Sequence, residues 1–302
     1  MKTLEEILKI PKLLNKKISF ELNKEKKYLF VGCGSSYNIG LTVSEVMKKN
    51  GYSANVKTGG NIVLFDNENY DEAILITRTG TSTETVNSAK NLKKKNIHTI
   101  GITCGKDTDI VKNTDESFVF DFANEESVVM TGSFVYILNF LLNGIKEFDL
   151  SEDSKKVLDE SIKKIDKLNL KNYDHFVFLG FNENYGISKE GALKLQEMAL
   201  ARCEFHEPLE YRHGPKSTLT NKTLVIFNTT GTEMEKSLEE ELIKMGARVL
   251  TIGEKKEINI KNLSGFETPL RIIPIQYLGY KLAILKGLNP DNPKNLSKSV
   301  IL

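Results

Sequence analysis

Residues 28–37 read Y-L-F-V-G-C-G-S-S-Y, and residues 41–49 continue with L-T-V-S-E-V-M-K-K. The opening run Y-L-F-V is almost wholly apolar, which is typical of a strand buried on both faces of a parallel sheet. The glycines mark a tight turn, and the apolar residues after them recur with helical spacing. This strand, turn and helix predict an α/β fold in which helices cover parallel strands.

The second half of the chain repeats this pattern. Residues 176–185 read F-V-F-L-G-F-N-E-N-Y and again precede a helical stretch. A further pair of strand-and-loop segments also matches, A-I-L-I-T-R-T-G-T-S-T-E-T-V at 73–86 and L-V-I-F-N-T-T-G-T-E-M-E-K-S at 224–237. Each unit is a buried strand, a polar turn and a helix.

The two copies keep a nearly constant offset. Gly32 and Gly180 are 148 residues apart, and Gly80 and Gly231 are 151 apart. A period this long means two copies of a domain and not a solenoid. We therefore expect two tandem, doubly wound parallel-sheet (flavodoxin-like) subdomains covered by helices.

The repeat also predicts how the chain is divided. Residues 1–26 read as a helical segment broken at Pro11, outside the repeat. Residues 27–150 would form the first domain with its loops, and residues 151–302 the second domain with a closing helix and a C-terminal tail.

Composition narrows the class of protein. The chain has 302 residues, 40% hydrophobic and 27% charged, with a net charge of +2. These values are ordinary for a globular protein and give no electrostatic footprint for nucleic acid. We expect no membrane span, because no run of 18 apolar residues occurs, and no signal peptide, because Glu5, Glu6 and Pro11 interrupt the start.

The cysteines and histidines indicate neither a metal nor another cofactor. Cys33, Cys104 and Cys203 are odd in number and widely spaced, so they suggest no disulfide framework and no zinc site. The four histidines form no HExxH pattern. Unpaired cysteines favour a reducing compartment, so we expect a cytoplasmic protein.

Two loops rich in glycine and hydroxyls follow strands of the first half. One is G-C-G-S-S at 32–36, and the other is T-R-T-G-T-S-T at 77–83. Hydroxyls and free amides at a helix N-terminus can bind phosphate, and ligands in open α/β sheets lie beyond the carboxyl ends of strands. The alternative is that these residues are ordinary helix caps and turn formers.

Nucleotide binding is a weaker interpretation. The segment after Gly32 lacks the third glycine of GxGxxG, and no acidic residue ends the next strand near Val56. No Walker A lysine follows either loop.

The second half carries ionisable groups. The stretch E-G-A-L-K-L-Q-E places Glu190, Lys194 and Glu197 on one helix face, and R-H-G-P-K-S contains His213. The alternatives are a solvated helix face with a salt bridge and a histidine in a turn.

The chain ends N-L-S-K-S-V-I-L at 295–302, and its three apolar residues predict a packed tail that brings Lys298 with it. The alternative is that this lysine is a surface charge.

These motifs together resemble the SIS (sugar isomerase) domain family. The resemblance rests on G-C-G-S-S-Y, T-G-T-S-T-E-T, E-G-A-L-K-L-Q-E, R-H-G-P-K-S and N-L-S-K-S-V, in that order, from about residue 28 to residue 300. Within the family the chain is most similar to the isomerase half of glutamine–fructose-6-phosphate aminotransferases. The resemblance implies an enzyme that isomerises a phosphosugar between ketose and aldose, working as a homodimer with a shared active site.

The resemblance also implies roles for individual residues. Glu197 would carry a proton between C1 and C2, Lys298 would form a Schiff base with the ketose, and His213, supplied across the dimer interface, would open the sugar ring. Lys194 and Glu190 would be supporting charges, and Val128 would contact the sugar through its backbone. The phosphate and sugar would be held by Ser35, Ser36, Thr77, Thr79, Ser82 and Ser297, with Arg78 beside them.

The residue types suit this chemistry. A proton shuttle needs a carboxylate that can act near neutral pH, ring opening suits a histidine, and a nucleophilic lysine must lose its proton.

The sequence also departs from the aminotransferases. We expect no glutaminase domain, because the repeat starts by about residue 28, and T-R-T-G-T-S with Y-R-H-G-P-K-S looks more like the SIS sugar-phosphate deaminases and isomerases. The first expectation is therefore an isomerase or deaminase that interconverts glucosamine 6-phosphate, or a related amino sugar phosphate, and fructose 6-phosphate. A synthase-like aminotransferase that uses free ammonia and a non-catalytic SIS sugar-phosphate sensor remain as alternatives.

Overall fold

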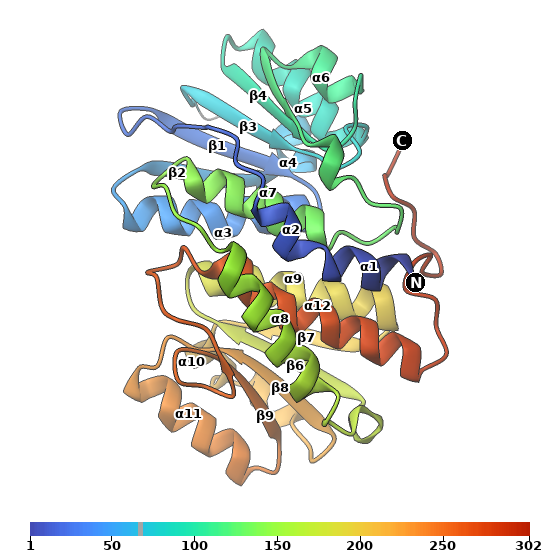
Figure 1. Cartoon of the computed structure of the whole chain (residues 1–302). Coiled ribbons are helices and arrows are strands. Elements are labelled where there is room, and N and C mark those ends of the chain that lie inside the picture. The colour runs from blue at the N-terminus through green and yellow to red at the C-terminus, as the bar shows by residue number, and fades with distance from the viewer. Residues whose placement is uncertain (66–68) are drawn as a thin grey trace.

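The computed structural model describes residues 1–65 and 69–302, and each half contains a five-stranded parallel sheet (Figure 1). The first sheet has the order β2-β1-β3-β4-β5, and the second, read from the opposite edge, has the order β7-β6-β8-β9-β10. The chain passes through both sheets in the same pattern, so the expected pair of doubly wound α/β subdomains is confirmed. The strands are β1 Lys27–Gly32, β2 Ser53–Thr58, β3 Glu72–Ile76, β4 His98–Thr103, β5 Glu116–Val119, β6 His175–Gly180, β7 Arg202–His206, β8 Thr223–Asn228, β9 Arg248–Gly253 and β10 Ile258–Asn259.

Helices connect the strands and cover both faces of each sheet. The α-helices are α1 Lys2–Leu8, α2 Ile10–Leu14, α3 Ser35–Lys49, α4 Gly59–Phe65, α5 Thr83–Lys94, α6 Asp109–Asn113, α7 Gly132–Asn143, α8 Ser151–Ile165, α9 Glu183–Ala199, α10 Pro208–Tyr211, α11 Glu233–Lys244 and α12 Thr268–Leu285. Three short 3₁₀ turns are η1 Asp121–Ala123, η2 Leu170–Asn172 and η3 Pro215–Thr218.

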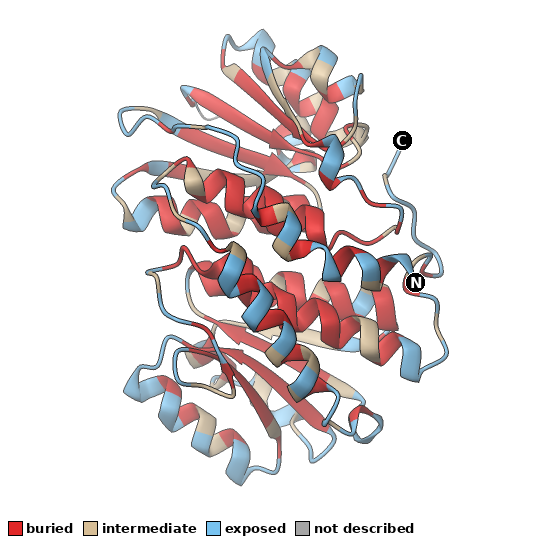
Figure 2. Cartoon of the chain, viewed as in Figure 1, coloured by how far each residue is buried: buried red, intermediate tan, exposed pale blue. Residues whose placement is uncertain are grey.

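Four of these helices, α3, α7, α9 and α12, lie between the two sheets (Figure 1). Figure 2 shows that much of this layer is buried, and every residue of α7 except its last is buried. The closing helix predicted after residue 268 is α12, which packs on α9. No helix in the described ranges is long and apolar enough to cross a membrane.

The leading segment, expected to be helical over residues 1–26, is helical over Lys2–Leu8 and Ile10–Leu14 only; residues 15–26 form no helix, and the break between the two helices lies before Pro11. Lys9 ends α1 and caps α2, and Pro11 stands in the first turn of α2. A proline is tolerated there, because the first N–H groups of a helix have no intrahelical partner.

The N-terminal helix and the C-terminal segment both hold the loop between β5 and α7. Glu6 of α1 accepts hydrogen bonds from the backbone N–H groups of Glu126 (2.7 Å) and Ser127 (3.1 Å). Asp291 accepts from the N–H of Thr3 (2.8 Å), and its own carbonyl accepts from the N–H of Val128 (3.0 Å). The two ends of the chain therefore position one loop of the first subdomain.

Candidate active site

A row of three charged residues runs along α9. The ammonium of Lys194 lies 2.5 Å from Glu197 Oε2 and 3.3 Å from Glu190 Oε1. The side chains of Lys194 and Glu190 are fully buried, whereas that of Glu197 is 16% exposed. A solvated helix face is therefore excluded, because two of the three charges lie inside the protein.

Burial and charge act together on this row. Burial raises the pKa of Glu190, although the ammonium of Lys194 opposes that shift. Burial also acts to lower the pKa of Lys194, but the carboxylates of Glu190 and Glu197 outweigh it and the pKa is raised. Lys194 is thus held as a cation. A supporting charge must stay protonated in this way, whereas a nucleophilic lysine must lose its proton.

The row is joined to the N-terminus of α3 in the other subdomain. Lys194 Nζ donates to Ser35 Oγ (3.0 Å), and Asn38 Nδ2, one turn further along α3, donates to Glu190 (2.8 Å). Asn38 was not predicted from the sequence. Its spacing of three residues from Ser35 was the signal that could have found it.

A close approach of backbone shapes this end of α3. A Cβ on Gly32 would lie 2.7 Å from the backbone carbonyl carbon of Ser36, and Gly34 has a φ of 55°. Glycine therefore suits both positions, and the turn holds Ser35 and Ser36 in buried places at the helix N-terminus.

Residues 77–83 form the second predicted loop, which we call the hydroxyl loop. It leaves β3 and leads into α5. Since β3 pairs in parallel with β1, both loops lie at the carboxyl ends of neighbouring strands. Thr77 Oγ1 is 3.3 Å from Ser82 Oγ, and Thr81 Oγ1 is 3.1 Å from Thr79 Oγ1. The hydroxyls predicted to bind phosphate therefore gather at one place.

The matching loop of the second half already holds an anion. The carboxylate of Glu235 accepts from the N–H groups of Thr230 (2.9 Å) and Thr232 (2.9 Å) and from both hydroxyls (2.7 and 3.0 Å). This chain therefore uses such a loop to bind a carboxylate at a helix N-terminus.

The hydroxyl loop has no such internal carboxylate. Glu84 stands 151 residues before Glu235, the same offset as Gly80 from Gly231. Within the described residues its carboxylate makes none of the equivalent bonds, and its Oε2 has no hydrogen-bond partner. The equivalent anion position of the first half is thus left to something other than this glutamate.

Arg78 and Val128 are tied to each other. Arg78 Nη2 donates to the Val128 carbonyl (2.6 Å), and Nη1 lies 3.3 Å from Glu125 Oε2. The place of Arg78 beside the phosphate stays a prediction; its buried guanidinium neutralises Glu125 and fixes the loop at 125–128. The N–H of Val128 is bonded to Asp291, so the carbonyl is the backbone group that retains an acceptor site.

The C-terminal segment lies over these loops. Lys298 Nζ donates to the Glu125 carbonyl (2.9 Å). Ser299 Oγ accepts from Thr81 Oγ1 (3.1 Å) and lies 3.3 Å from Ser82 Oγ. The tail thus places Lys298 at the same end of the first sheet as the hydroxyl loop.

The prediction that apolar residues 300–302 pack against the chain is wrong for the single chain. Val300 is 54% exposed, Ile301 77% and Leu302 84%. Hydrogen bonds hold the tail instead: besides those of Lys298 and Ser299, the Thr83 N–H donates to the Val300 carbonyl (3.2 Å) and the Leu302 N–H donates to Thr83 Oγ1 (3.0 Å). The exposed Ser297 bonds within the tail, to the Ser299 carbonyl (2.8 Å).

His213 stands apart from the other predicted residues. It is exposed and follows α10, which lies in the second subdomain far from the C-terminus (Figure 1). Its only hydrogen bond in the described chain is backbone, from its N–H to the Glu210 carbonyl (3.0 Å). The described residues include no cluster of His, Cys, Asp and Glu arranged to hold a metal.

Comparison with known proteins places this geometry in a family. Residues 21–141 match the family model of the SIS domain. The crystal structure of a glucosamine-6-phosphate deaminase from Thermotoga maritima superimposes with a TM-score of 0.91, at 39% identity and over 100% of both chains. The chain belongs to the SIS domain family.

Other SIS proteins match over nearly the whole chain. A glutamine–fructose-6-phosphate aminotransferase of Pyrococcus horikoshii is 27% identical over 317 residues, which cover 94% of this chain and 53% of that protein. The chain thus spans about half the length of the curated relatives that it matches. The C-terminal domain of the Francisella tularensis aminotransferase, at 21% identity and a TM-score of 0.80, covers 97% of this chain and 98% of that one and shares its fold.

Proposed function

We propose that the protein is a phosphosugar isomerase that deaminates glucosamine 6-phosphate to fructose 6-phosphate and ammonia. The observation that carries this proposal is a hydroxyl loop without an internal carboxylate, next to a buried charge row that ends in the accessible Glu197. The relative from Thermotoga maritima, a glucosamine-6-phosphate deaminase by name, supports the substrate because it matches this chain from end to end.

The phosphate of the substrate would take the place that Glu235 fills in the second half. Thr77, Thr79 and Ser82 supply hydroxyls, and the N-terminus of α5 adds its dipole. Ser35 and Ser36 complete the site from the neighbouring strand end.

Glu197 is the proposed base. It is the one carboxylate of the row that reaches solvent, and Lys194 holds it from behind. It would remove the proton from C2 of the open-chain aldose and return a proton to C1, which leaves an imine at C2.

Lys298 is the proposed nucleophile toward C2. It is exposed and held by a single carbonyl, so it can leave that position at little cost. Attack of its amine on the C2 imine would expel ammonia and form a lysine imine, which water then hydrolyses to the ketose. Lys194 cannot serve in this way, because two carboxylates keep it protonated.

We further propose that two copies of the chain form a homodimer with shared active sites. Ring opening needs a group that exchanges protons near neutral pH, and His213 suits it. Glu197 belongs to α9, which packs on one face of the second sheet, and His213 follows α10, which packs on the other face, so His213 would act in the site of the partner copy. The exposed residues 300–302 would be buried in such a dimer.

Glutamine is not expected to supply nitrogen to the 302-residue chain. Burial raises the pKa of all three thiols, Cys33, Cys104 and Cys203, and that of Cys203 reaches about 12. A nucleophilic cysteine needs the opposite shift. The thiols are also unpaired, and we propose the cytoplasm as the compartment on that ground.

The proposal is tested by turnover of purified protein. Glucosamine 6-phosphate is supplied, and fructose 6-phosphate and ammonium are assayed; the reverse reaction is run with fructose 6-phosphate and excess ammonium. We expect equal amounts of both products and no effect of glutamine. Turnover in the synthetic direction alone would favour the ammonia-using aminotransferase, and tight binding without turnover in either direction would favour the sensor.

A further inference from the structure

Glu6 is a buried carboxylate on α1, outside the two repeated halves of the chain. Its side chain belongs to a residue that is 7% exposed, and it accepts from the N–H groups of Glu126 (2.7 Å) and Ser127 (3.1 Å) and from the Ser127 hydroxyl. A buried charge needs hydrogen-bond partners, and here one loop of the first subdomain supplies all three. Glu6 therefore holds that loop by its backbone.

The N-terminal helices lie directly against the start of α7. A Cβ on Gly132, the first residue of α7, would lie 3.1 Å from the Glu6 carbonyl oxygen and 2.8 Å from Cδ1 of Leu13. Glycine at this position therefore permits the close approach that brings the Glu6 carboxylate to the loop before α7.

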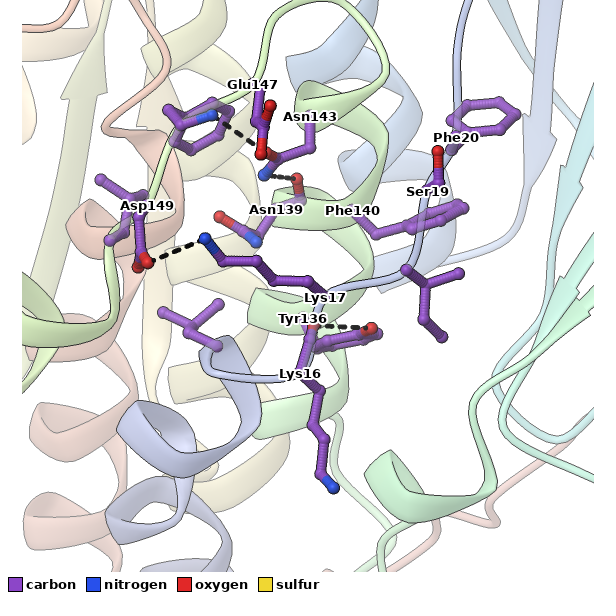
Figure 3. A pocket seen from close by; sticks show the side chains of 14 residues that line it. Lys16, Lys17, Ser19, Phe20, Tyr136, Asn139, Phe140, Asn143, Glu147 and Asp149 are labelled. Carbon is purple, nitrogen blue, oxygen red and sulfur yellow. Dashed lines mark hydrogen bonds and ion pairs between the residues drawn. The ribbon is translucent and has the colours of Figure 1, made fainter.

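Other contacts keep the N-terminal segment in its place. Asp291 accepts from the N–H (2.8 Å) and the hydroxyl (2.7 Å) of Thr3 at the start of α1. Further along the chain, the hydroxyl of Tyr136 on α7 donates to the Lys16 carbonyl (3.2 Å), beside a cavity of about 280 Å³ (Figure 3). We therefore expect α1 to stay in place when Glu6 alone is changed.

The loop that Glu6 holds also contacts residues of the proposed active site. The Glu125 carbonyl accepts from Lys298 Nζ (2.9 Å), and the Val128 carbonyl accepts from Arg78 Nη2 (2.6 Å). The N–H groups that Glu6 binds lie between these two carbonyls in the sequence. A shift of the loop would therefore move the place where Lys298 is held.

We propose that Glu6 is a positioning residue of the active site, which fixes the loop at 125–128 and, through the Glu125 carbonyl, the place of Lys298. This inference rests on the nucleophilic role proposed above for Lys298. A misplacement of about 1 Å can cost about 100-fold in rate. Since Glu6 makes no bond to the hydroxyl loop within the described chain, its loss should lower kcat and leave KM for the phosphosugar nearly unchanged.

The first test measures kcat and KM for glucosamine 6-phosphate with full-length variants. Glu6→Ala removes the acceptor, Glu6→Asp keeps the charge but withdraws it by one methylene, and Glu6→Gln keeps an acceptor at the same reach. We expect kcat to fall about 10–100-fold in the alanine variant, less in the aspartate variant, and to stay within about threefold in the glutamine variant. The control Glu5→Ala, which changes an exposed residue of the same helix, should match the wild type.

The second test needs no turnover. Reductive methylation with formaldehyde and cyanoborohydride, followed by mass spectrometry, compares the labelling rate of Lys298 with that of Lys294, an exposed lysine of the same segment. The ratio of the two rates should rise about threefold or more in Glu6→Ala, because the Lys298 amine loses its acceptor, and should not change in Glu5→Ala. A merely structural role would lower Tm without changing this ratio or kcat of the folded protein.

The inference is overturned if folded Glu6→Ala keeps the wild-type kcat, if KM alone changes, or if the labelling ratio stays at the wild-type value. If the alanine variant does not fold, the aspartate variant decides by the same measurements. If the wild type turns over no sugar phosphate, the proposed reaction fails, and the labelling ratio alone decides whether Glu6 positions Lys298.

Discussion

Two lysines near the proposed site are held in opposite ways. Lys194 is fully buried and ion-paired with Glu190 and Glu197, whereas Lys298 is exposed and donates to one backbone carbonyl. Buried ion pairs are costly to break, and the single, partly buried hydrogen bond of Lys298 is less so. Lys194 is therefore fixed in place, and Lys298 is held less tightly, which is compatible with the nucleophilic role proposed for it.

Lys298→Ala is expected to abolish ketose formation while changing the free energy of unfolding by no more than about 0.5 kcal/mol, because the side chain is exposed. Borohydride should trap the ketose phosphate on the wild type and on the control Lys294→Ala, which alters an exposed lysine of the same segment. Mass spectrometry locates the adduct. An adduct on another lysine would disprove the assignment of Lys298.

Lys194→Met is expected to lower the free energy of unfolding by about 3–5 kcal/mol near pH 7, because it leaves Glu190 buried without a cation. Burial already raises the pKa of Glu190 above 4.5, and loss of the lysine raises it further. A carboxyl with a raised folded pKa stabilises the fold fully below its unfolded pKa, and that stability is lost as pH rises through the folded value.

The deficit of Lys194→Met should therefore be smaller at pH 5 than at pH 8, and the double variant with Glu190→Gln should recover part of it. Urea unfolding at both pH values measures this. A deficit that does not change with pH would mean that Glu190 stays ionised without its lysine.

At the scale of elements, two equivalent loops differ in whether they bind a carboxylate of the chain. The loop before α11 is closed by Glu235, whereas the hydroxyl loop before α5 has no such carboxylate. Thr79 and Thr230 occupy matching places, since each lies one residue before the glycine of its loop, Gly80 or Gly231.

Thr79→Ala is expected to raise KM for the phosphosugar roughly 10–100-fold, because a hydrogen bond to a charged group contributes about 1.5–3 kcal/mol. Thr230→Ala should leave KM unchanged and lower stability by about 1–2 kcal/mol, since it removes the hydroxyl that binds Glu235. Steady-state kinetics and thermal unfolding separate the two effects. A similar rise in KM for both variants would contradict binding of phosphate at the hydroxyl loop.

The periodic parts of the chain were the predictable ones. Buried strands such as Phe176–Leu179 and the repeated glycine turns follow local rules, so both sheets and the closing helix were foreseen. The charge row on α9 was visible as a spacing, but its burial was not, because that depends on α3 and α12 packing over it.

Contacts between distant residues were not predictable. The alternation of polar and apolar residues does not say that Arg78 bonds Val128 or that Asn38 reaches Glu190. The tail misled for the same reason: three apolar residues predict burial, but no part of the described chain covers residues 300–302.

At the scale of the whole molecule, two of the proposed catalytic residues, Glu197 and His213, lie on separate elements. Glu197 lies near the C-terminal end of α9, and His213 follows α10 in a different part of the second subdomain (Figure 1). A complete site therefore requires a second copy, if both residues act on one sugar.

Mixing inactive His213→Ala with inactive Glu197→Gln protein is expected to restore about one quarter of the wild-type activity at equal amounts. Random exchange makes half of the dimers mixed, and each mixed dimer contains one intact site. Exchange is verified by native mass spectrometry with a mass-tagged subunit. Mixed dimers without activity would show that the site is not shared in this way.

The most direct measurement is proton NMR of glucosamine 6-phosphate incubated with the protein in heavy water. The account predicts that the sugar signals are replaced by those of fructose 6-phosphate with matching release of ammonium, and that deuterium enters C1 of the ketose as Glu197 exchanges its proton with solvent. Glu197→Gln should bind the sugar, since an amide nearly matches a carboxylate in shape, but should leave its spectrum unchanged. Wild-type protein that binds glucosamine 6-phosphate and leaves it intact and undeuterated would contradict the proposed reaction.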